Sequence, residues 1–89
     1  NRVDEGELTA LKEAAAGGDM QARFDYAEAA FAAGHRDAAA DELLAMFEAD
    51  REWNDGASRT KLLQIFEAVG LEDPWVVATR RRLSKILFG

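Results

Sequence analysis

The chain has 89 residues, the length of one small domain, and it is 48% apolar and 31% charged, as in an ordinary globular protein. No apolar run approaches the roughly 18 residues that would predict a transmembrane helix, and the absence of cysteine excludes disulfides, thiolate metal sites and thiol catalysis in this segment. The net charge is −6, with four Lys/Arg against twelve Asp/Glu in residues 1–50 and seven against five in residues 51–89. Such an acidic first half argues against a nucleic-acid-binding surface over the whole domain.

The first predicted helix covers residues 1–18. Acidic side chains occupy its first turn, where they interact favourably with the positive end of the helix dipole. Its apolar stripe consists of Leu8, Leu11 and Ala15, and a pair of glycines ends it. Asp19 is the predicted N-cap of the next helix, because its carboxylate can accept hydrogen bonds from unpaired backbone N–H groups.

Residues 20–50 form a predicted helical hairpin with its turn at Gly34, a residue suited to the positive φ that ends a helix. Apolar side chains recur at steps of three and four residues in both halves of the segment, as expected for two helices that each bury one face. These residues are Met20, Phe24, Ala27 and Phe31 in the first half, and Ala39, Leu43 and Phe47 in the second.

This hairpin resembles a tetratricopeptide repeat, a helix–turn–helix unit of 34 residues. With Gly34 in the turn, Tyr26 occupies the large apolar position of the first helix, and Ala39 occupies the small position of the second. Arg23 replaces the usual tryptophan of the family, and Arg51 replaces the closing proline. The resemblance implies stacked hairpins whose first helices line a concave binding surface. Arg23 and its neighbours are the candidates on that surface, although we expect Tyr26 to lie in the core.

Residues 50–56 connect the two halves of the chain. Either Asn54 or Asp55 is the predicted N-cap of the next helix. Trp53 precedes that cap, where it can staple the chain to the helix, and we expect it to pack structurally, with exposure to a partner as the alternative. His35 is the only histidine, and without cysteines or converging carboxylates it is a poor metal or catalytic candidate.

Two further helices are predicted over residues 57–69 and 74–87. Gly70 ends the former, and Asp73 followed by proline is the clearest helix start in the chain. We expect the core of the whole domain to contain Leu8, Leu11, Phe24, Ala27, Phe31, Leu43, Phe47, Leu62, Phe66, Val76 and Leu83.

Arg80, Arg81 and Arg82 lie consecutively on the last predicted helix, and consecutive helical residues point about 100° apart, so the three cannot form one patch. Salt bridges to the acidic first half are the simplest interpretation, and anchoring of an acidic partner segment is the alternative. Ile86, Leu87 and Phe88 make an apolar terminus. These residues either close the core or dock in an apolar groove on a partner.

The second half also resembles the chaperedoxins, thioredoxin-like proteins of the YbbN type whose C-terminal region is a small tetratricopeptide-type helical domain. The preceding hairpin with Gly34 fits the same pattern, so the resemblance covers nearly the whole chain and is weakest before Gly18. The residues that carry it are Trp53, Asn54, Asp55, Ala57, Leu62, Leu63, Phe66, Gly70, Asp73, Pro74, Val76, Arg80, Arg81, Leu83, Leu87 and Phe88.

The resemblance implies a cytoplasmic bacterial co-chaperone with an N-terminal thioredoxin-like domain, of which residues 1–89 would be a C-terminal piece without a leading methionine. Its partners would be unfolded client proteins and the Hsp70 or chaperonin machines, with no cofactor, nucleic acid or membrane. The predicted protein-binding residues are Arg23, Trp53, Arg80, Arg81, Arg82, Ile86, Leu87 and Phe88.

The predicted fold is all-α, with antiparallel hairpins stacked as a tetratricopeptide-repeat-like array of about five helices. A generic helical scaffold or dimerisation module is the alternative function, and an uncovered end of the array makes a homodimer of the isolated domain a further expectation. An enzyme or a helix-turn-helix DNA binder is disfavoured, because the sequence lacks a nucleophile–base pair, a glycine-rich phosphate loop and a clearly basic recognition helix.

Overall fold

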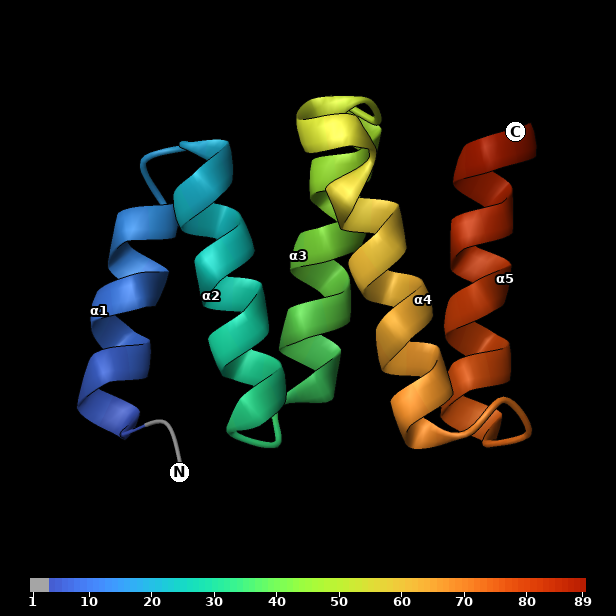
Figure 1. The fold of residues 1–89 in the computed structure, drawn as a ribbon, viewed down its shortest axis with the longest axis horizontal. Coiled ribbons are helices and arrows are strands. Elements are labelled where there is room, and N and C mark those ends of the chain that lie inside the picture. Colours follow the sequence, from blue (N-terminus) through green and yellow to red (C-terminus); the bar gives the residue numbers. More distant parts are fainter. Residues whose placement is uncertain (1–3) are drawn as a thin grey trace.

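The computed structural model describes residues 4–89 as an all-α array, as predicted. Its five α-helices follow one another from one end of the array to the other (Figure 1). The first residues of the predicted segment 1–18 lie outside the described part of the chain. The helices are α1 (Glu5–Ala15), α2 (Met20–Ala32), α3 (Arg36–Ala49), α4 (Ala57–Val69) and α5 (Pro74–Phe88), with a 3₁₀ turn, η1 (Trp53–Asp55), before α4.

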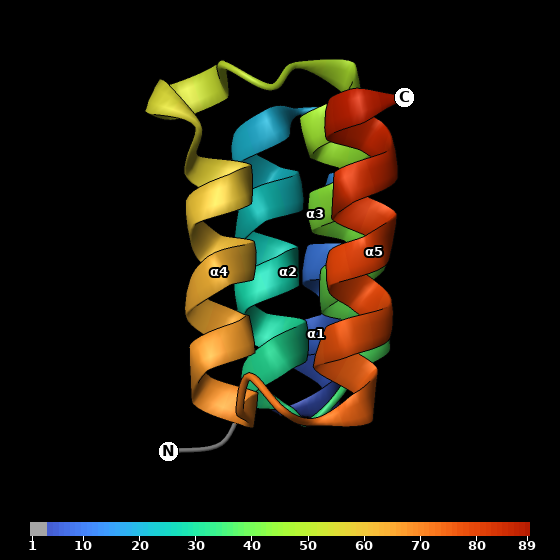
Figure 2. The same ribbon diagram turned by 90° about the vertical axis from the view of Figure 1, so that its right-hand side faces the viewer.

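The helices form two layers, with α2 and α4 in one and α1, α3 and α5 in the other (Figure 2). Helix α3 is central, because it packs on α2, α4 and α5. The array measures 35 × 26 × 17 Å. Since sequential neighbours lie side by side, no helix buries its apolar stripe without the next one, as expected for stacked hairpins.

Short carboxylate side chains begin three of the helices. Asp19 accepts a hydrogen bond from the backbone N–H of Ala22 (2.9 Å), and Asp73 accepts one from the N–H of Trp75 (2.8 Å), so both predicted N-caps are confirmed. Asp4 caps α1 in the same way. Each bond satisfies a donor that the helix itself leaves unpaired, which fixes where the helix begins.

The predicted cap of α4 is wrong. Asn54 and Asp55 have φ of 49° and 57°, and the N-cap is Gly56 with φ of 79°, which makes no side-chain cap bond. An N-capping side chain requires a backbone in the extended region, whereas here two residues within η1 and the glycine that follows it adopt positive φ in succession. Asparagine, aspartate and glycine are the residues that tolerate this conformation best.

Eight of the eleven predicted core residues are buried, while Leu11, Phe24 and Phe31 are only partly buried and pack against the core from its edge. Tyr26 is buried, as expected. The prediction missed several buried residues, most of them on α3 and α4: Ala30, Ala40, Leu44, Met46 and Ile65. The core is therefore broadest around α3, where one helix meets three neighbours.

Candidate protein-interaction surfaces

A groove of about 510 Å³ runs between α1 and α3, with α2 as its floor. A second hollow of about 280 Å³ adjoins it and shares three of its lining residues, Lys12, Tyr26 and Ala38. The remaining lining residues of the larger groove are Ala15, Ala16, Gly18, Arg23 and Glu42. The groove combines small apolar side chains with a few polar ones, the composition expected of a ligand-binding concavity.

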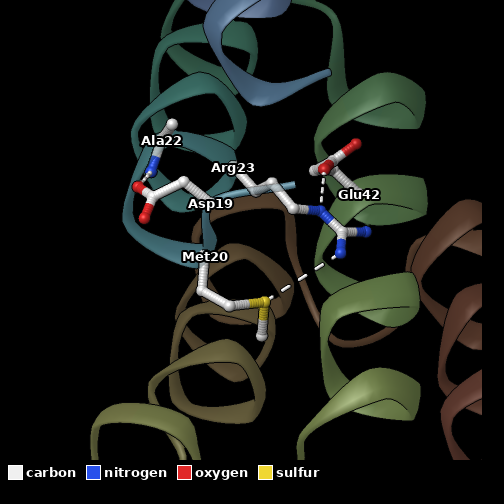
Figure 3. A network of polar contacts seen from close by, with 5 residues as sticks. All are labelled: Asp19, Met20, Ala22, Arg23 and Glu42. Carbon is white, nitrogen blue, oxygen red and sulfur yellow. Dashed lines mark hydrogen bonds and ion pairs between the residues drawn. The ribbon is translucent and has the colours of Figure 1, made fainter. Parts of the chain in front are cut away.

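Arg23 forms one wall of this groove. Its Nε donates to the carboxylate of Glu42 on α3, and its guanidinium lies 3.9 Å from the sulfur of Met20 (Figure 3). The side chains of Arg23 and Glu42 are only 19% and 23% exposed. The structure thus places the predicted binding residue Arg23 in the groove, but already paired with an acid.

Tyr26 and Lys12 lie where the two hollows meet. Tyr26 is 8% exposed, and its hydroxyl forms none of the hydrogen bonds found among residues 4–89, although it is not among the fully buried unpaired polar atoms. Lys12 is exposed and takes part in none of the ion pairs of the described chain. The groove therefore offers a hydroxyl and an ammonium to a ligand, besides its apolar walls.

Trp53 is partly buried and packs against the edge of the core. Its ring lies 5.6 Å from that of Phe24, centroid to centroid, with a 52° tilt between the planes. Lys61 covers the same phenylalanine at 5.9 Å from the ring centroid and pairs with Glu28 at 3.0 Å. Structural packing of Trp53 is thus confirmed, and the ring joins η1 to α2.

The three consecutive arginines of α5 point in different directions, as their spacing predicts. Arg82 donates to Asp41 of α3 at 2.8 Å, in agreement with the expected salt bridges to the acidic half. Arg80 and Arg81 are exposed, and neither takes part in an ion pair among the described residues. Two of the three cations remain open to a partner.

The predicted apolar terminus divides into two kinds of residue. Ile86 and Leu87 are partly buried and pack against the core, so they contribute to closing it. Phe88 is 86% exposed, and its ring does not contribute to the core. The three residues do not form one surface, because successive positions of a helix face different directions.

Other exposed apolar side chains were not predicted as binding residues. Leu63 is 39% exposed, Val77 is 40% exposed and Leu71 is 55% exposed. With Phe88 they are the only large exposed hydrophobic residues in the described chain, and all four lie in α4, α5 or the loop between them. Leu63 and Val77 each follow a buried residue of the same helix, and helical periodicity could not show that no neighbouring helix covers them.

The groove residues Lys12 and Ala38 were also missed. Neither belongs to an apolar stripe or a sequence motif, and the groove exists only because α1 and α3 stand apart above α2. Within residues 4–89, no cluster of three or more histidine, aspartate or glutamate residues is arranged to hold a metal ion. None of the described helices is long and apolar enough to cross a membrane.

The family model described as tetratricopeptide repeat matches residues 1–88, nearly the whole chain. Comparisons with curated proteins and with solved structures gave no significant match.

Proposed function

Because the chain belongs to the tetratricopeptide repeat family, we propose that it is the protein-interaction domain of a thioredoxin-like co-chaperone. Repeats of this family generally mediate protein–protein binding on a non-catalytic helical scaffold. The observation that supports this role best is the groove of about 510 Å³ between α1 and α3. It is open, and residues from three helices line it, so it can receive a segment of another protein without rearranging the core.

The finer part of the proposal concerns the partners. The chaperedoxin resemblance, carried by residues such as Trp53, Asp73 and Pro74, supports unfolded clients and the Hsp70 or chaperonin machines as partners. It also supports a cytoplasmic parent protein with an N-terminal thioredoxin-like domain. In that parent any thiol chemistry belongs to the other domain, because residues 1–89 contain no cysteine.

Affinity capture from lysate tests this role. The 89-residue chain serves as bait, and captured proteins are quantified by mass spectrometry against beads alone. Enrichment of chaperonin or Hsp70 is expected. Failure to enrich either machine, with a bait shown to be folded by circular dichroism, would refute the co-chaperone assignment.

Two charge reversals on α1 locate the binding surface. Lys12 lines the groove, whereas Glu7 is exposed on the same helix but lines neither hollow. We expect Lys12→Glu to reduce chaperone capture and Glu7→Lys to leave it unchanged. The two variants change the net charge in opposite directions, so equal losses would point to a general disturbance of α1 rather than to the groove.

The second candidate function is a generic scaffold or dimerisation module. The exposed apolar residues of α4 and α5 favour it, because uncovered helix faces are common self-association sites. Light scattering over a range of concentrations distinguishes the two candidates. A molar mass that remains that of the monomer, together with capture of chaperones, supports the co-chaperone role. A stable dimer that captures neither machine supports the module.

A further inference from the structure

We propose that the outer face of the α4–α5 pair binds an amphipathic, acidic helix of a partner protein, which adds to the array as its next helix. The inference rests on the proposed interaction role, but it names a surface separate from the α1–α3 groove. It also names the chemistry of the segment that fits there.

The outer face is defined by Leu63 on α4 and by Val77, Arg81, Ser84 and Phe88 on α5. The four α5 residues follow one another at steps of four, three and four, so they form one continuous row along the helix. Each is exposed, and Leu63 is exposed on α4. Figure 2 looks onto this end of the array and shows α4 and α5 with no further element in front of them.

The opposite side of α5 shows that this row faces away from the molecule. Trp75 donates its indole N–H to Asp37 of α3, and Arg82 donates to Asp41 of the same helix. Ile86 packs against the core from that side. Since Trp75, Arg82 and Ile86 lie on the α3 side of α5, the row of Val77 to Phe88 points to the free end of the array.

A helical partner fits the shape of this face. No large hydrophobic side chain of the described α1–α3 segment is exposed, whereas the outer face carries three, Leu63, Val77 and Phe88. The row spans α5 from near its start to its last residue, a length of about 15–20 Å at 1.5 Å per residue. A helix of about 15 residues is therefore long enough to cover it.

The charge of the face selects an acidic partner. Arg81 lies within the row and Arg80 lies beside it, and no carboxylate of the described chain pairs with either. Arg59, one turn before Leu63 on α4, adds a third cation that takes part in none of these pairs. Glu67, one turn after Leu63, is an exposed carboxylate of the same helix, and the three arginines outnumber it. Apolar side chains bordered by cations fit an apolar stripe bordered by glutamates, and they repel a basic helix.

Titration with two synthetic peptides tests the proposal. The acidic peptide has about 15 residues, a leucine stripe at helical spacing and glutamates beside it, and the control peptide replaces each glutamate by lysine. Binding is followed by the amide NMR shifts of the isotopically labelled 89-residue chain. We expect the acidic peptide alone to bind, with shifts confined to the surroundings of Leu63, Val77, Arg81 and Phe88.

Variants of α5 provide the matched comparison. Arg80→Gln with Arg81→Gln should weaken binding on the order of tenfold, the combined effect of two exposed charge pairs. Arg82→Gln removes one positive charge from the α3 side and should leave the affinity unchanged. Val77→Asp should abolish binding, and because Val77 is 40% exposed the variant should remain folded by circular dichroism.

Several outcomes would overturn the proposal: equal binding of both peptides, shifts that map to the α1–α3 groove, or no binding at all. A dimer in sedimentation velocity that Val77→Asp dissociates would also overturn it, since a second copy would then be the occupant. The chaperone capture experiment is independent of this one. If the Val77→Asp variant loses peptide binding but still captures chaperones, the proposed function remains supported and is assigned to the α1–α3 groove.

Discussion

The segment α1–α3 and the pair α4–α5 differ in the size of the side chains that join their helices. Ala27 and Ala30 of α2 and Ala39 of α3 are completely buried, and these two helices make the most extensive contact in the array. Large side chains join α4 to α5: Phe66 packs edge to face against Trp75, with 6.4 Å between the ring centroids. Small residues let backbones approach closely, whereas large ones hold helices apart.

The two parts also differ in what they leave exposed. All large exposed hydrophobic residues of the described chain belong to α4, α5 or their connecting loop, and none belongs to α1–α3. The charges divide in the same way, since residues 1–50 carry a net −8 and residues 51–89 a net +2. The segment α1–α3 is therefore closely packed and carries the groove, whereas α4–α5 carries the open apolar face.

The largest effect should come from removing the ring that joins α4 to α5. Phe66 is 1% exposed, so Phe66→Ala leaves a cavity and should lower the free energy of unfolding by about 3–5 kcal/mol. Leu63→Ala, three residues earlier on the outer face, should cost less than about 1 kcal/mol, because that side chain is 39% exposed. Urea denaturation followed by circular dichroism measures both. Similar losses would show that Leu63 is packed and that the outer face is not open.

Replacing a buried alanine by a larger residue tests how closely α2 and α3 pack. Ala30→Leu inserts three carbons where the residue has no exposed surface, and it should destabilise the domain by about 1–3 kcal/mol. Ala32→Leu, on the exposed side of α2, should stay within about 0.5 kcal/mol of the parent. Thermal or urea unfolding distinguishes the two. A tolerated leucine at residue 30 would mean that the α2–α3 contact is less tight than its alanines imply.

Ser58 carries a polar group that α4 does not satisfy. It is 1% exposed, and its hydroxyl has no hydrogen-bond partner among residues 4–89. Ser58→Ala should therefore raise the free energy of unfolding by about 1 kcal/mol, because the unpaired hydroxyl no longer has to be buried. Ser84→Ala, at an exposed position of α5, should gain only the few tenths of a kcal/mol due to helix propensity. A loss of stability in Ser58→Ala would indicate a hydrogen bond to this hydroxyl in solution.

Local signals predicted the elements well. Asp19 and Asp73 were identified as N-caps because a capping carboxylate acts within three residues of itself. Apolar periodicity predicted most of the core, but of the stripe predicted for α2 only Ala27 is fully buried. The cap of α4 was mistaken because the chain reverses through left-handed residues, and this conformation depends on where the preceding helix has to lead. Leu11 and Phe24 are only partly buried, because periodicity identifies an apolar face but not the extent of its cover.

The candidate surfaces were harder to predict than the helices. Arg23 was chosen from its place in the repeat pattern, yet its pairing with Glu42 joins residues 19 positions apart and depends on how α2 and α3 pack. The groove around Lys12 depends on the separation of α1 from α3, for which the sequence holds no local signal. Phe88 was chosen for its apolar character, and the structure shows it exposed.

The smallest expected effect concerns two ion pairs, a partly buried one between α2 and α3 and an exposed one between α3 and α5. Arg23 and Glu42 are 19% and 23% exposed, whereas Arg82 and Asp41 are 53% and 60% exposed. A double-mutant cycle on the first pair should give a coupling energy of about 1 kcal/mol, and the second pair should give about 0.3 kcal/mol, because solvent screens exposed charges. Glutamine and asparagine replacements keep the side-chain shapes while removing the charges.

The salt dependence of the coupling energies distinguishes the two ion pairs further. Raising the ionic strength to about 1 M shortens the screening length to about 3 Å, so it should remove most of the Arg82–Asp41 coupling and spare much of the other. Equal and weak couplings in both pairs would contradict this expectation. Arg23 could then exchange Glu42 for an acidic group of a partner at little cost in free energy. Arg23 would in that case be a binding residue rather than a structural one.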